Sequence, residues 1–306
     1  MKIALVGLGQ VGTSVGLALR AVSDAFEIVG HDPDDERVKR ARKLKAVDST
    51  HWNLISACEG AELVVIDQPM QETCSTLEAL ESGLEGEEPP VVIDTCRVKR
   101  PVMQAARGRT SYVFVGGDPV SAGMRSVGEP SAELFQSGVF YLVAGIDTPP
   151  EALNRCNNLS QALGATPRFC DAAEHDGLMA AMTQMPAMAN LAIINALGQT
   201  AGQQDRADSV GALLAALGPI PTVDDVSGWQ ANRDNVVRWL AQVGQAIGAL
   251  QRTIESDEGD ALREQVEQAE AQLASWQSKG DDSDALDNQP GMLRSMFLGG
   301  LGQKRR

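Results

Sequence analysis

The sequence predicts an α/β protein in which a doubly wound parallel sheet is followed by an all-helical domain. Short apolar runs rich in Val and Ile alternate with helix-length segments over the first half of the chain, and a glycine-rich turn joins the first run to the first helix. Beyond residue 170 the strand pattern disappears and Ala- and Leu-rich segments dominate. Alternating strands and helices typically form parallel sheets with right-handed crossovers. We therefore expect a sheet domain over residues 1–170, a helical domain over 171–279 and a terminal segment over 280–306.

The predicted strands are apolar nearly throughout, as expected when helices cover both faces of a sheet. They span residues 3–6, 27–30, 63–66, 91–94 and 112–115, with further strands at 140–144 and 166–169. The predicted helices between them span residues 11–22, 34–44, 71–84 and 98–107.

The helical domain is predicted from long segments with apolar residues three or four positions apart. These segments are residues 176–197, 209–217, 232–254 and 259–276. One helix face carries Val236, Leu240, Val243, Ile247, Leu250 and Ile254. Such a face needs an apolar partner, so we expect a homodimer formed through this domain.

The terminal segment divides into an acidic and an apolar part. Residues 280–289 are polar and acidic, which predicts flexibility. Residues 292–301 are apolar, and the chain stops at three basic residues. This end is either frayed or docked on the protein itself, or it contacts a partner or a membrane surface.

The composition disfavours several classes of partner. The formal net charge of −15 opposes binding to nucleic acid. The five cysteines form no CxxC pair and the first apolar run is too short for a secretory signal, so we expect a cytoplasmic protein with free thiols. No stretch approaches the roughly 20 apolar residues that span a bilayer. The three histidines are too scattered for a metal site.

The glycine-rich turn has the pattern of a dinucleotide-binding loop. Gly7, Gly9 and Gly12 form GxGxxG directly after the first predicted strand and at the start of the first predicted helix. The first glycine allows the tight turn, the second lets the backbone approach a pyrophosphate, and the third permits close packing of helix on strand. This context predicts a Rossmann-type domain.

An acid at the end of the second predicted strand supports the same conclusion. Asp32 follows Gly12 by 20 residues, where a carboxylate accepts hydrogen bonds from the adenine ribose. Asp34 and Asp35 are also acidic and no Arg is immediately adjacent in sequence, so we expect NAD rather than NADP. Later strand ends are expected to face the nicotinamide, although Pro69 also fits a simple strand terminator. The expected cofactor-binding residues are Gly7, Leu8, Gly9, Gln10, Val11, Gly12, Asp32, Pro69 and Asp94.

The order of motifs over residues 1–255 resembles the prephenate and arogenate dehydrogenases of tyrosine biosynthesis. The segments that carry the resemblance are GLGQVGTSVGLALR, VVIDTCRVKRPVM, FVGGDPVSAGMRSVGEPSAELFQSGVFYLV, LGATPRFCDAAEHDGLMAAMTQMPAMANLAI and DDVSGWQANRDNVVRWL. They are similar, in order, to the family's nucleotide loop, its D-x-x-S-x-K strand end, its G-G-H-P-x-x-G segment, its E-H-D and S-H-x-P-H segments, and its D-P-x-x-W segment. The resemblance implies an oxidative decarboxylation: a hydride passes to the nicotinamide, and a ring carboxylate leaves as carbon dioxide. It also implies a small carboxylated substrate, which is prephenate, arogenate or a related alcohol.

The sequence departs from the family at the residues that would do this chemistry. Asp118 stands where the family has its catalytic His, and Arg97 replaces the Ser of D-x-x-S-x-K. Gln184 and Ala187 replace the two His residues of S-H-x-P-H, and no Arg precedes Trp229. The matched positions that are retained are Lys99, Gly117, Pro119, Gly123, His175, Asp176, Pro186, Trp229 and Asn235.

These substitutions leave two interpretations of the site. In one, Asp118 is the base or hydrogen-bond acceptor, Arg97 and Lys99 hold anions, Gln184 is a polar contact and His175 is the imidazole available for proton transfer. In the other, Asp118 and Arg97 form an internal salt bridge without catalysis, and His175 caps a helix or joins domains. The first predicts an NAD(P)-dependent dehydrogenase, and the second a nucleotide-binding or regulatory protein. A hydroxyacid or 6-phosphogluconate type of dehydrogenase is disfavoured, because the second domain has no Gly-Gly-x-x-Lys segment.

Overall fold

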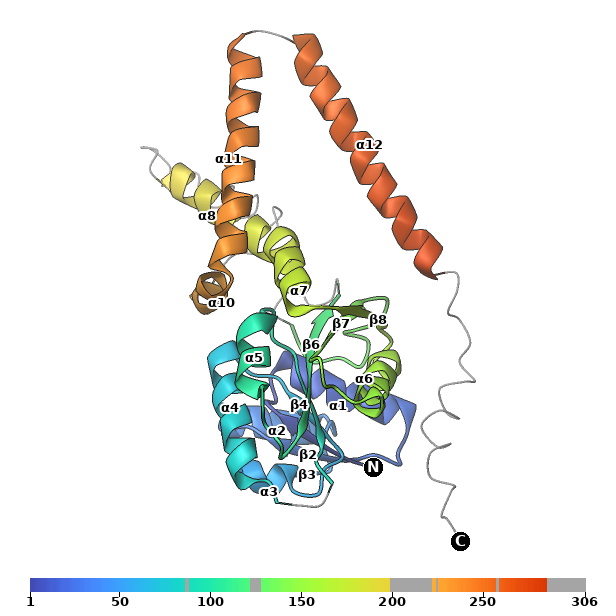
Figure 1. The fold of residues 1–306 in the computed structure, drawn as a ribbon. Helices are drawn as coiled ribbons and strands as arrows, with labels where there is room; N and C mark the ends of the chain where they lie inside the picture. The colour runs from blue at the N-terminus through green and yellow to red at the C-terminus, as the bar shows by residue number, and fades with distance from the viewer. Residues whose placement is uncertain (86–87, 122–127, 199–221, 224, 257–258, 285–306) are drawn as a thin grey trace. The chain divides into compact units, whose positions relative to one another are not determined.

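The computed structural model describes residues 1–85, 88–121, 128–198, 222–223, 225–256 and 259–284 (Figure 1). The chain divides into two compact units, Met1–Arg233 and Asp234–Arg306. The first unit contains the entire sheet and the residues that concern function, and the second contains long helices. The boundary that the sequence predicts near residue 170 coincides with the change from strands to helices. That it also separates two domains stays a prediction.

The first unit is organised by an eight-stranded sheet with the order β3-β2-β1-β4-β5-β6-β7-β8. The strands are β1 (Lys2–Val6), β2 (Glu27–His31), β3 (Ser49–Thr50), β4 (Leu63–Ile66), β5 (Val91–Asp94), β6 (Val113–Val120), β7 (Val139–Ala144) and β8 (Thr166–Cys170). β1 pairs in parallel with β2 on one side and β4 on the other, so the strand order reverses at β1. Ligands of doubly wound sheets bind at such a switch point, beyond the carboxyl ends of the strands. The predicted fold class is confirmed.

One pairing departs from the expected parallel sheet. β6 and β7 are antiparallel, with Asp118 opposite Tyr141, whereas β7 and β8 are parallel. Antiparallel neighbours need no crossover helix, and the apolar pattern of a strand carries no information on its direction. β6 also continues to Val120, beyond its predicted end at residue 115, so Gly117 and Asp118 lie within a strand.

Helices cover both faces of the sheet, with α1 beside α6 on one face and α4 beside α5 on the other (Figure 1). The helices are α1 (Gln10–Val22), α2 (Asp35–Lys43), α3 (Leu54–Cys58), α4 (Met70–Gly83), α5 (Lys99–Ala106) and α6 (Pro150–Ala162). Under α4 and α5 the core includes Val6, Val64, Ile66, Leu77, Leu80, Val92 and Val102. Three elements were not predicted: β3 and α3, which are too short to show periodicity, and α6, which packs partly through small residues such as Ala152 and Ser160.

A nearly continuous helical run follows the sheet. It comprises α7 (Ala172–Met179), a π-helical turn η2 (Ala180–Gln184) and α8 (Met185–Gly198). Pro186 has no N–H to donate and its ring crowds the carbonyl four residues before it, which explains a widened turn at this point. Asp171 caps α7 by accepting hydrogen bonds from the N–H groups of Ala173 and Glu174. After residues 199–221, α10 (Asp225–Ala231) completes the described helices of this unit.

The helical run corrects one expectation about membranes. Residues Ala172–Gly198 are long and apolar enough, with a mean hydropathy of 1.3, to cross a bilayer by length and composition alone. Core helices of soluble proteins pass the same test, and a third of the apolar window is buried inside the protein. His175 and Asp176 near its start are fully buried, which is typical of a helix packed within a protein core.

The second unit contains most of α11 (Arg233–Glu255) and α12 (Gly259–Asp284). α12 extends to Asp284, so the first five residues of the terminal segment that was expected to be flexible are helical. Along α11, Leu240, Ile247 and Ile254 expose 41%, 60% and 64% of their surface. The predicted helix at 209–217 and the tail from residue 285 lie outside the described residues.

Candidate functional site

The turn between β1 and α1 requires glycine at two positions. Gly7 has a φ of 95°, and a Cβ atom there would lie 1.9 Å from the carbonyl oxygen of Asp67. A Cβ on Gly12 would lie 2.1 Å from the carbonyl oxygen of Gly7. A Cβ on Gly9 would meet nothing closer than 3.4 Å among the described residues. The protein therefore leaves space over Gly9, as the approach of a pyrophosphate demands.

The start of α1 is also suited to an anion. Gly9 is the N-cap residue and has no side chain to cap the helix, and the first turn itself contains no acidic residue, although Asp67 beyond β4 accepts a hydrogen bond from the N–H of Gly12. Uncapped N–H groups and the helix dipole favour a phosphate at such a terminus. Leu8, Gln10 and Val11 belong to this turn, so the structure brings the expected loop residues together.

Asp32 lies at the end of β2, where its carboxylate holds the turn. One oxygen accepts a hydrogen bond from the N–H of Leu8 at 2.7 Å, and the other accepts from the N–H of Asp34 at 2.8 Å. The fold also brings Arg37 beside it: an Nη atom lies 3.8 Å from Asp32 Oδ2, and Nε lies 3.5 Å from Asp34 Oδ2. No Arg is immediately adjacent to these acids in the sequence, but the first turn of α2 brings Arg37 to them in space.

The two later strand ends differ from each other. Pro69 is the exposed N-cap residue of α4, beyond β4. Asp94 ends β5 in the interior, where its carboxylate accepts hydrogen bonds from Lys99 Nζ at 2.6 Å and the N–H of Gly117 at 2.9 Å. Asp94 was expected to face the cofactor, but its oxygens are engaged by the protein.

Lys99 is fully buried at the start of α5. Its ammonium group donates to Asp94 Oδ2 at 2.6 Å and to the carbonyl oxygen of Gly117 at 2.5 Å. The expectation that Lys99 holds a substrate anion therefore gives way to a structural role, in which it joins β5, α5 and β6.

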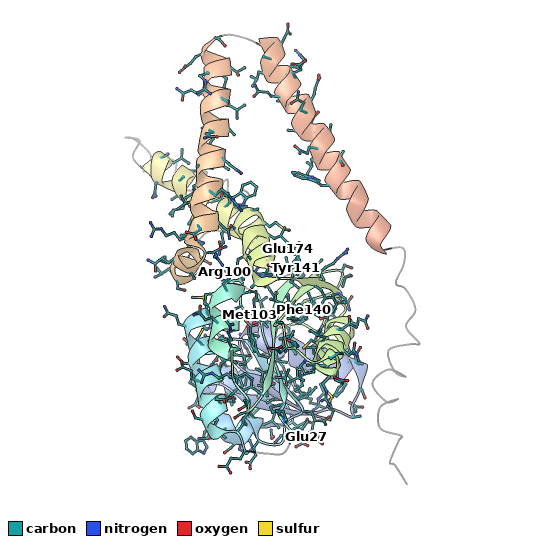
Figure 2. The ribbon with its side chains drawn as sticks, viewed as in Figure 1. Glu27, Arg100, Met103, Phe140, Tyr141 and Glu174 are labelled. Atoms are coloured by element: carbon teal, nitrogen blue, oxygen red, sulfur yellow. The ribbon has the colours of Figure 1, made fainter. Side chains whose placement is uncertain are left out.

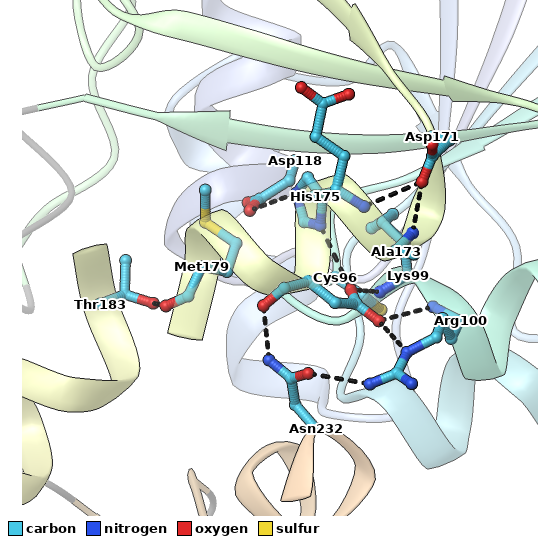
Figure 3. Close-up of polar contacts among 12 residues, drawn as sticks. Cys96, Lys99, Arg100, Asp118, Asp171, Ala173, His175, Met179, Thr183 and Asn232 are labelled. Atoms are coloured by element: carbon cyan, nitrogen blue, oxygen red, sulfur yellow. Dashed lines mark hydrogen bonds and ion pairs between the residues drawn. The ribbon is translucent and has the colours of Figure 1, made fainter. Parts of the chain in front are cut away.

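His175 lies between two carboxylates (Figure 3). Its Nε2 atom is 3.2 Å from Asp118 Oδ2, and its Nδ1 atom is 3.4 Å from Asp176 Oδ1. Both carboxylates and the imidazole are buried. The ring of Tyr141 meets the imidazole edge-on, with centroids 5.6 Å apart. In Figure 2, Arg100, Tyr141 and Glu174 lie together at this end of the sheet, and Glu27 marks the opposite end.

Asp176 joins α7 to the first turn of α5. It accepts hydrogen bonds from the N–H of Lys99 at 2.6 Å, the N–H of Arg100 at 3.1 Å and Arg100 Nε at 3.0 Å. Asn232 extends the network, since its amide donates to the Asp176 carbonyl and to Gln184 Oε1 and accepts from Arg100. Gln184 is buried, and its hydrogen bond with Asn232 connects it to this network.

The network perturbs the pKa values of its members. Burial alone would lower the pKa of His175, but the hydrogen bonds with Asp118 and Asp176 outweigh burial and raise it. Burial would raise the pKa of Asp176, but the bonds from His175 and from the N–H groups of Lys99 and Arg100 lower it. When His175 is protonated, the negative charges of three carboxylates are balanced by three cations. The carboxylates are Asp94, Asp118 and Asp176, and the cations are Lys99, Arg100 and His175.

One atom of the network is left over. Asp118 Oδ1 is buried and has no hydrogen-bond partner among the residues that the structure describes. A buried acceptor without a donor costs about 1–3 kcal/mol, so proteins rarely retain one without use. This oxygen can accept a hydrogen bond from a hydroxyl group brought next to it.

Arg97 does not form the salt bridge that the sequence left open. Asp118 pairs with His175 instead, and Arg97 is half-buried without an ion pair in the described part of the chain.

Within the same residues, no group of three His, Cys, Asp or Glu side chains is arranged to hold a metal ion.

Sequence reasoning missed Arg100 and Asn232, whose roles depend on contacts between segments far apart in the chain. It also missed Asp67, which follows β4 and whose Oδ2 atom accepts a hydrogen bond from the N–H of Gly12 at 2.7 Å. The acid at the end of an apolar strand, in VVIDQP, was the available signal for Asp67.

Known proteins resemble both the sequence and the fold. The sequence model of the prephenate dehydrogenase nucleotide-binding domain matches residues 15–167, half of the 306-residue chain. The prephenate dehydrogenase of Bacillus subtilis (strain 168) is 32% identical over 189 residues, which are 60% of this chain and 50% of that protein. The chain thus spans about half the length of this relative, and 51% of the Lactococcus lactis prephenate dehydrogenase.

Solved structures agree on the fold. The prephenate dehydrogenase from A. aeolicus, in complex with hydroxyphenyl propionate and NAD+, has a TM-score of 0.78 at 15% identity, over 90% of this chain and 98% of that chain. Synechocystis arogenate dehydrogenase has a TM-score of 0.70 at 22% identity, over 90% and 100% of the two chains. Together with the family match and the glycine loop, they lead to one conclusion: the chain belongs to the prephenate dehydrogenase family.

Proposed function

We propose that this protein is an NAD-dependent dehydrogenase that oxidises a small carboxylated alcohol of the prephenate or arogenate type, with loss of carbon dioxide. The observation that carries the proposal is the buried Asp118–His175 pair, in which Oδ1 of Asp118 lacks a donor among the described residues. The pair lies at the carboxyl edge of the sheet, where Asp118 occupies the place of the family's catalytic His.

The cofactor is held by the chain's own turn and strand ends. The N–H groups at the start of α1 bind the pyrophosphate, with Gly9 leaving space for it, and Asp32 accepts hydrogen bonds from the adenine ribose. Arg37 beside Asp32 is the group that would favour a 2′-phosphate, but Asp34 and Asp32 already pair with it. NAD is therefore the preferred cofactor, and comparing the binding of NADH and NADPH tests this choice.

A bound nicotinamide would supply the acceptor for the hydride of the carbon that bears the hydroxyl. Asp118 Oδ1 accepts the hydroxyl hydrogen, and the proton is retained by the Asp118–His175 pair when His175 starts neutral. The ring carboxylate leaves as carbon dioxide, its bonding electron pair enters the ring, and the ring oxygen takes the proton back from the Asp118–His175 pair. Asp176 fixes the imidazole through Nδ1, as an orienting carboxylate does in other proton-transfer sites.

Arg97 is the candidate for a substrate carboxylate. It sits between Asp94 and Lys99 in sequence, at the carboxyl end of β5, and its guanidinium has no anionic partner among the described residues. A guanidinium can hold a carboxylate in a bidentate pair. Gln184, buried beside Asn232, has a supporting role in orienting this side of the site.

The apolar face of α11 is proposed to pack against a second copy of the chain in the cytoplasm. Ile247 and Ile254 are more than half exposed, as are Val266 and Trp276 on α12. Burying such a row is favourable by about 25 cal/mol per Å². Sedimentation of the protein and of an Ile247→Glu variant tests the dimer: the variant is expected to be monomeric.

Turnover decides the proposal. NAD is offered with prephenate and with arogenate separately, and formation of the reduced nicotinamide is followed by absorbance. Reduction with either substrate supports the proposed dehydrogenase activity. Nucleotide binding without turnover of these or related carboxylated alcohols would favour a nucleotide-binding or regulatory protein instead.

A further inference from the structure

Asp67 places a carboxylate inside the glycine loop. Its Oδ2 atom accepts a hydrogen bond from the N–H of Gly12 at 2.7 Å, and its Oδ1 atom accepts from the hydroxyl of Thr95 at 2.8 Å. The same Oδ2 atom is the nearest group to a Cβ built on Gly9, at 3.4 Å. An acid therefore lies against the first turn of α1, where the helix terminus favours an anionic ligand.

Burial outweighs the groups that stabilise the charge of Asp67. Burial raises its pKa, and the hydrogen bonds from Gly12 and Thr95 offset this only in part. The charged groups that act on it are Asp32 at the end of β2, which raises the pKa, and Arg37 on α2, which lowers it. The residue that follows β5 contributes the neutral hydroxyl of Thr95, and the glycine loop contributes the backbone N–H of Gly12.

A bound pyrophosphate would bring a second anion to the same turn. The Asp67 carboxylate and a phosphate are both anions, and they repel each other strongly where water is displaced from between them. The neutral acid avoids this repulsion without losing its contacts, because its carbonyl oxygen still accepts from Gly12 and its hydroxyl can donate to Thr95 or to a phosphate oxygen.

We infer that Asp67 is a positioning residue of the nucleotide loop, and that its carboxylate takes up one proton from solvent when the pyrophosphate of the dinucleotide binds. The inference rests on the proposed cofactor. It makes cofactor affinity depend on pH: binding weakens as pH rises above the pKa of Asp67 in the free protein, by up to about tenfold per pH unit.

Calorimetric titration of the full-length protein with NADH tests this without reference to activity. The titration is repeated at one pH in two buffers of different ionisation enthalpy, which reports the protons taken up. We expect an uptake close to one proton at neutral pH, and affinity that falls between neutral and alkaline pH. Binding without proton uptake would overturn the inference and leave the proposed cofactor standing.

Variants assign the proton to Asp67. Asp67→Asn keeps an acceptor for Gly12, and it should bind NADH more tightly at alkaline pH, with no proton uptake and a flat pH dependence. Asp35→Asn removes an equal charge from the exposed start of α2, and it should retain the uptake. An Asp67→Asn variant that keeps the wild-type pH dependence would contradict the inference.

A second variant covers a failure of Asp67→Asn to fold. Thr95→Val removes one donor to the carboxylate, so it should shift the onset of weak binding to higher pH, and an unchanged onset would count against Asp67. If the wild-type protein binds neither NADH nor NADPH, the proposed cofactor fails and this inference fails with it.

Discussion

The Nε2 atom of His175 lies 3.2 Å from Oδ2 of Asp118, with both side chains buried, and the second oxygen of Asp118 has no donor in the part of the chain that the structure describes. The relationship joins α7 to β6, two elements far apart in the chain. Asp176 holds the other imidazole nitrogen. The pair therefore combines a fixed imidazole with one acceptor atom that is available to a ligand.

Replacing Asp118 by Asn should lower kcat by about 10²–10⁴-fold, the usual contribution of a positioned acid or base. The amide keeps the shape of the side chain but cannot take up a proton. The dissociation constant for NADH, measured by fluorescence, should stay within about twofold of wild type. An Asp118→Asn variant with wild-type kcat would remove Asp118 from the mechanism.

The stability of the protein should depend on pH through His175. Its pKa is raised in the folded state above the unfolded value of about 6.5. The stabilisation is fully present below about pH 6.5 and is lost as pH rises through the folded pKa. Each tenfold gain in the proton affinity of the imidazole on folding corresponds to about 1.4 kcal/mol of stability. Urea unfolding across this window measures the loss.

His175→Gln should remove this step from the unfolding profile. His51→Gln, at an exposed position, is the matched control and should keep it. If both variants and the wild type show the same pH dependence, the imidazole does not bind its proton more tightly in the folded protein.

The glycines of the loop should respond differently to an added methyl group. Gly9→Ala meets no close atom of the described residues, so it should fold normally and lose NADH affinity by about tenfold or more. Gly7→Ala combines a φ of 95° with a clash against the Asp67 carbonyl, so it should also unfold at lower temperature.

Gly60→Ala controls for backbone strain alone, because Gly60 has a φ of 67° and open space around it. It should cost about 1 kcal/mol of stability and leave NADH affinity unchanged. Equal NADH affinity in Gly9→Ala and Gly60→Ala would argue against a pyrophosphate over Gly9.

Arg97→Ala should raise KM for the carboxylated substrate by about tenfold or more, because a charged hydrogen bond to a carboxylate contributes about 1.5–3 kcal/mol. NADH affinity should change little. Arg107→Ala removes an equal charge from the exposed end of α5 and should leave KM unchanged. The same KM in both variants would show that Arg97 does not hold the substrate.

Local patterns in the sequence were enough for most of the sheet and for the nucleotide loop. β4 and β5 begin and end where the apolar runs at 63–66 and 91–94 do, because strands buried on both faces have sharp composition limits. Gly7, Gly12 and Asp32 were found because their spacing reflects contacts within one βαβ unit.

The cluster around His175 was harder to predict. The partner of Asp118 is 57 positions away, and the only partner that the sequence suggested for it was Arg97. The structure instead places His175 of α7 beside Asp118 of β6. The partner of Lys99 was also not predicted. Its buried ammonium group pairs with Asp94 of the protein interior and not with a substrate anion.

The most direct test of the account is the pH dependence of kcat/KM for NAD reduction with prephenate or arogenate. We expect activity to rise with pH through a pKa above about 6.5, the ordinary value for an imidazole, because His175 must be neutral to take up the proton. The activity that remains in Asp118→Asn should rise at lower pH than in the wild type, because the Asp118 carboxylate that raises the pKa of His175 is gone. A wild-type profile that is flat across this range, or one that Asp118→Asn leaves unshifted, would contradict the paired role of Asp118 and His175.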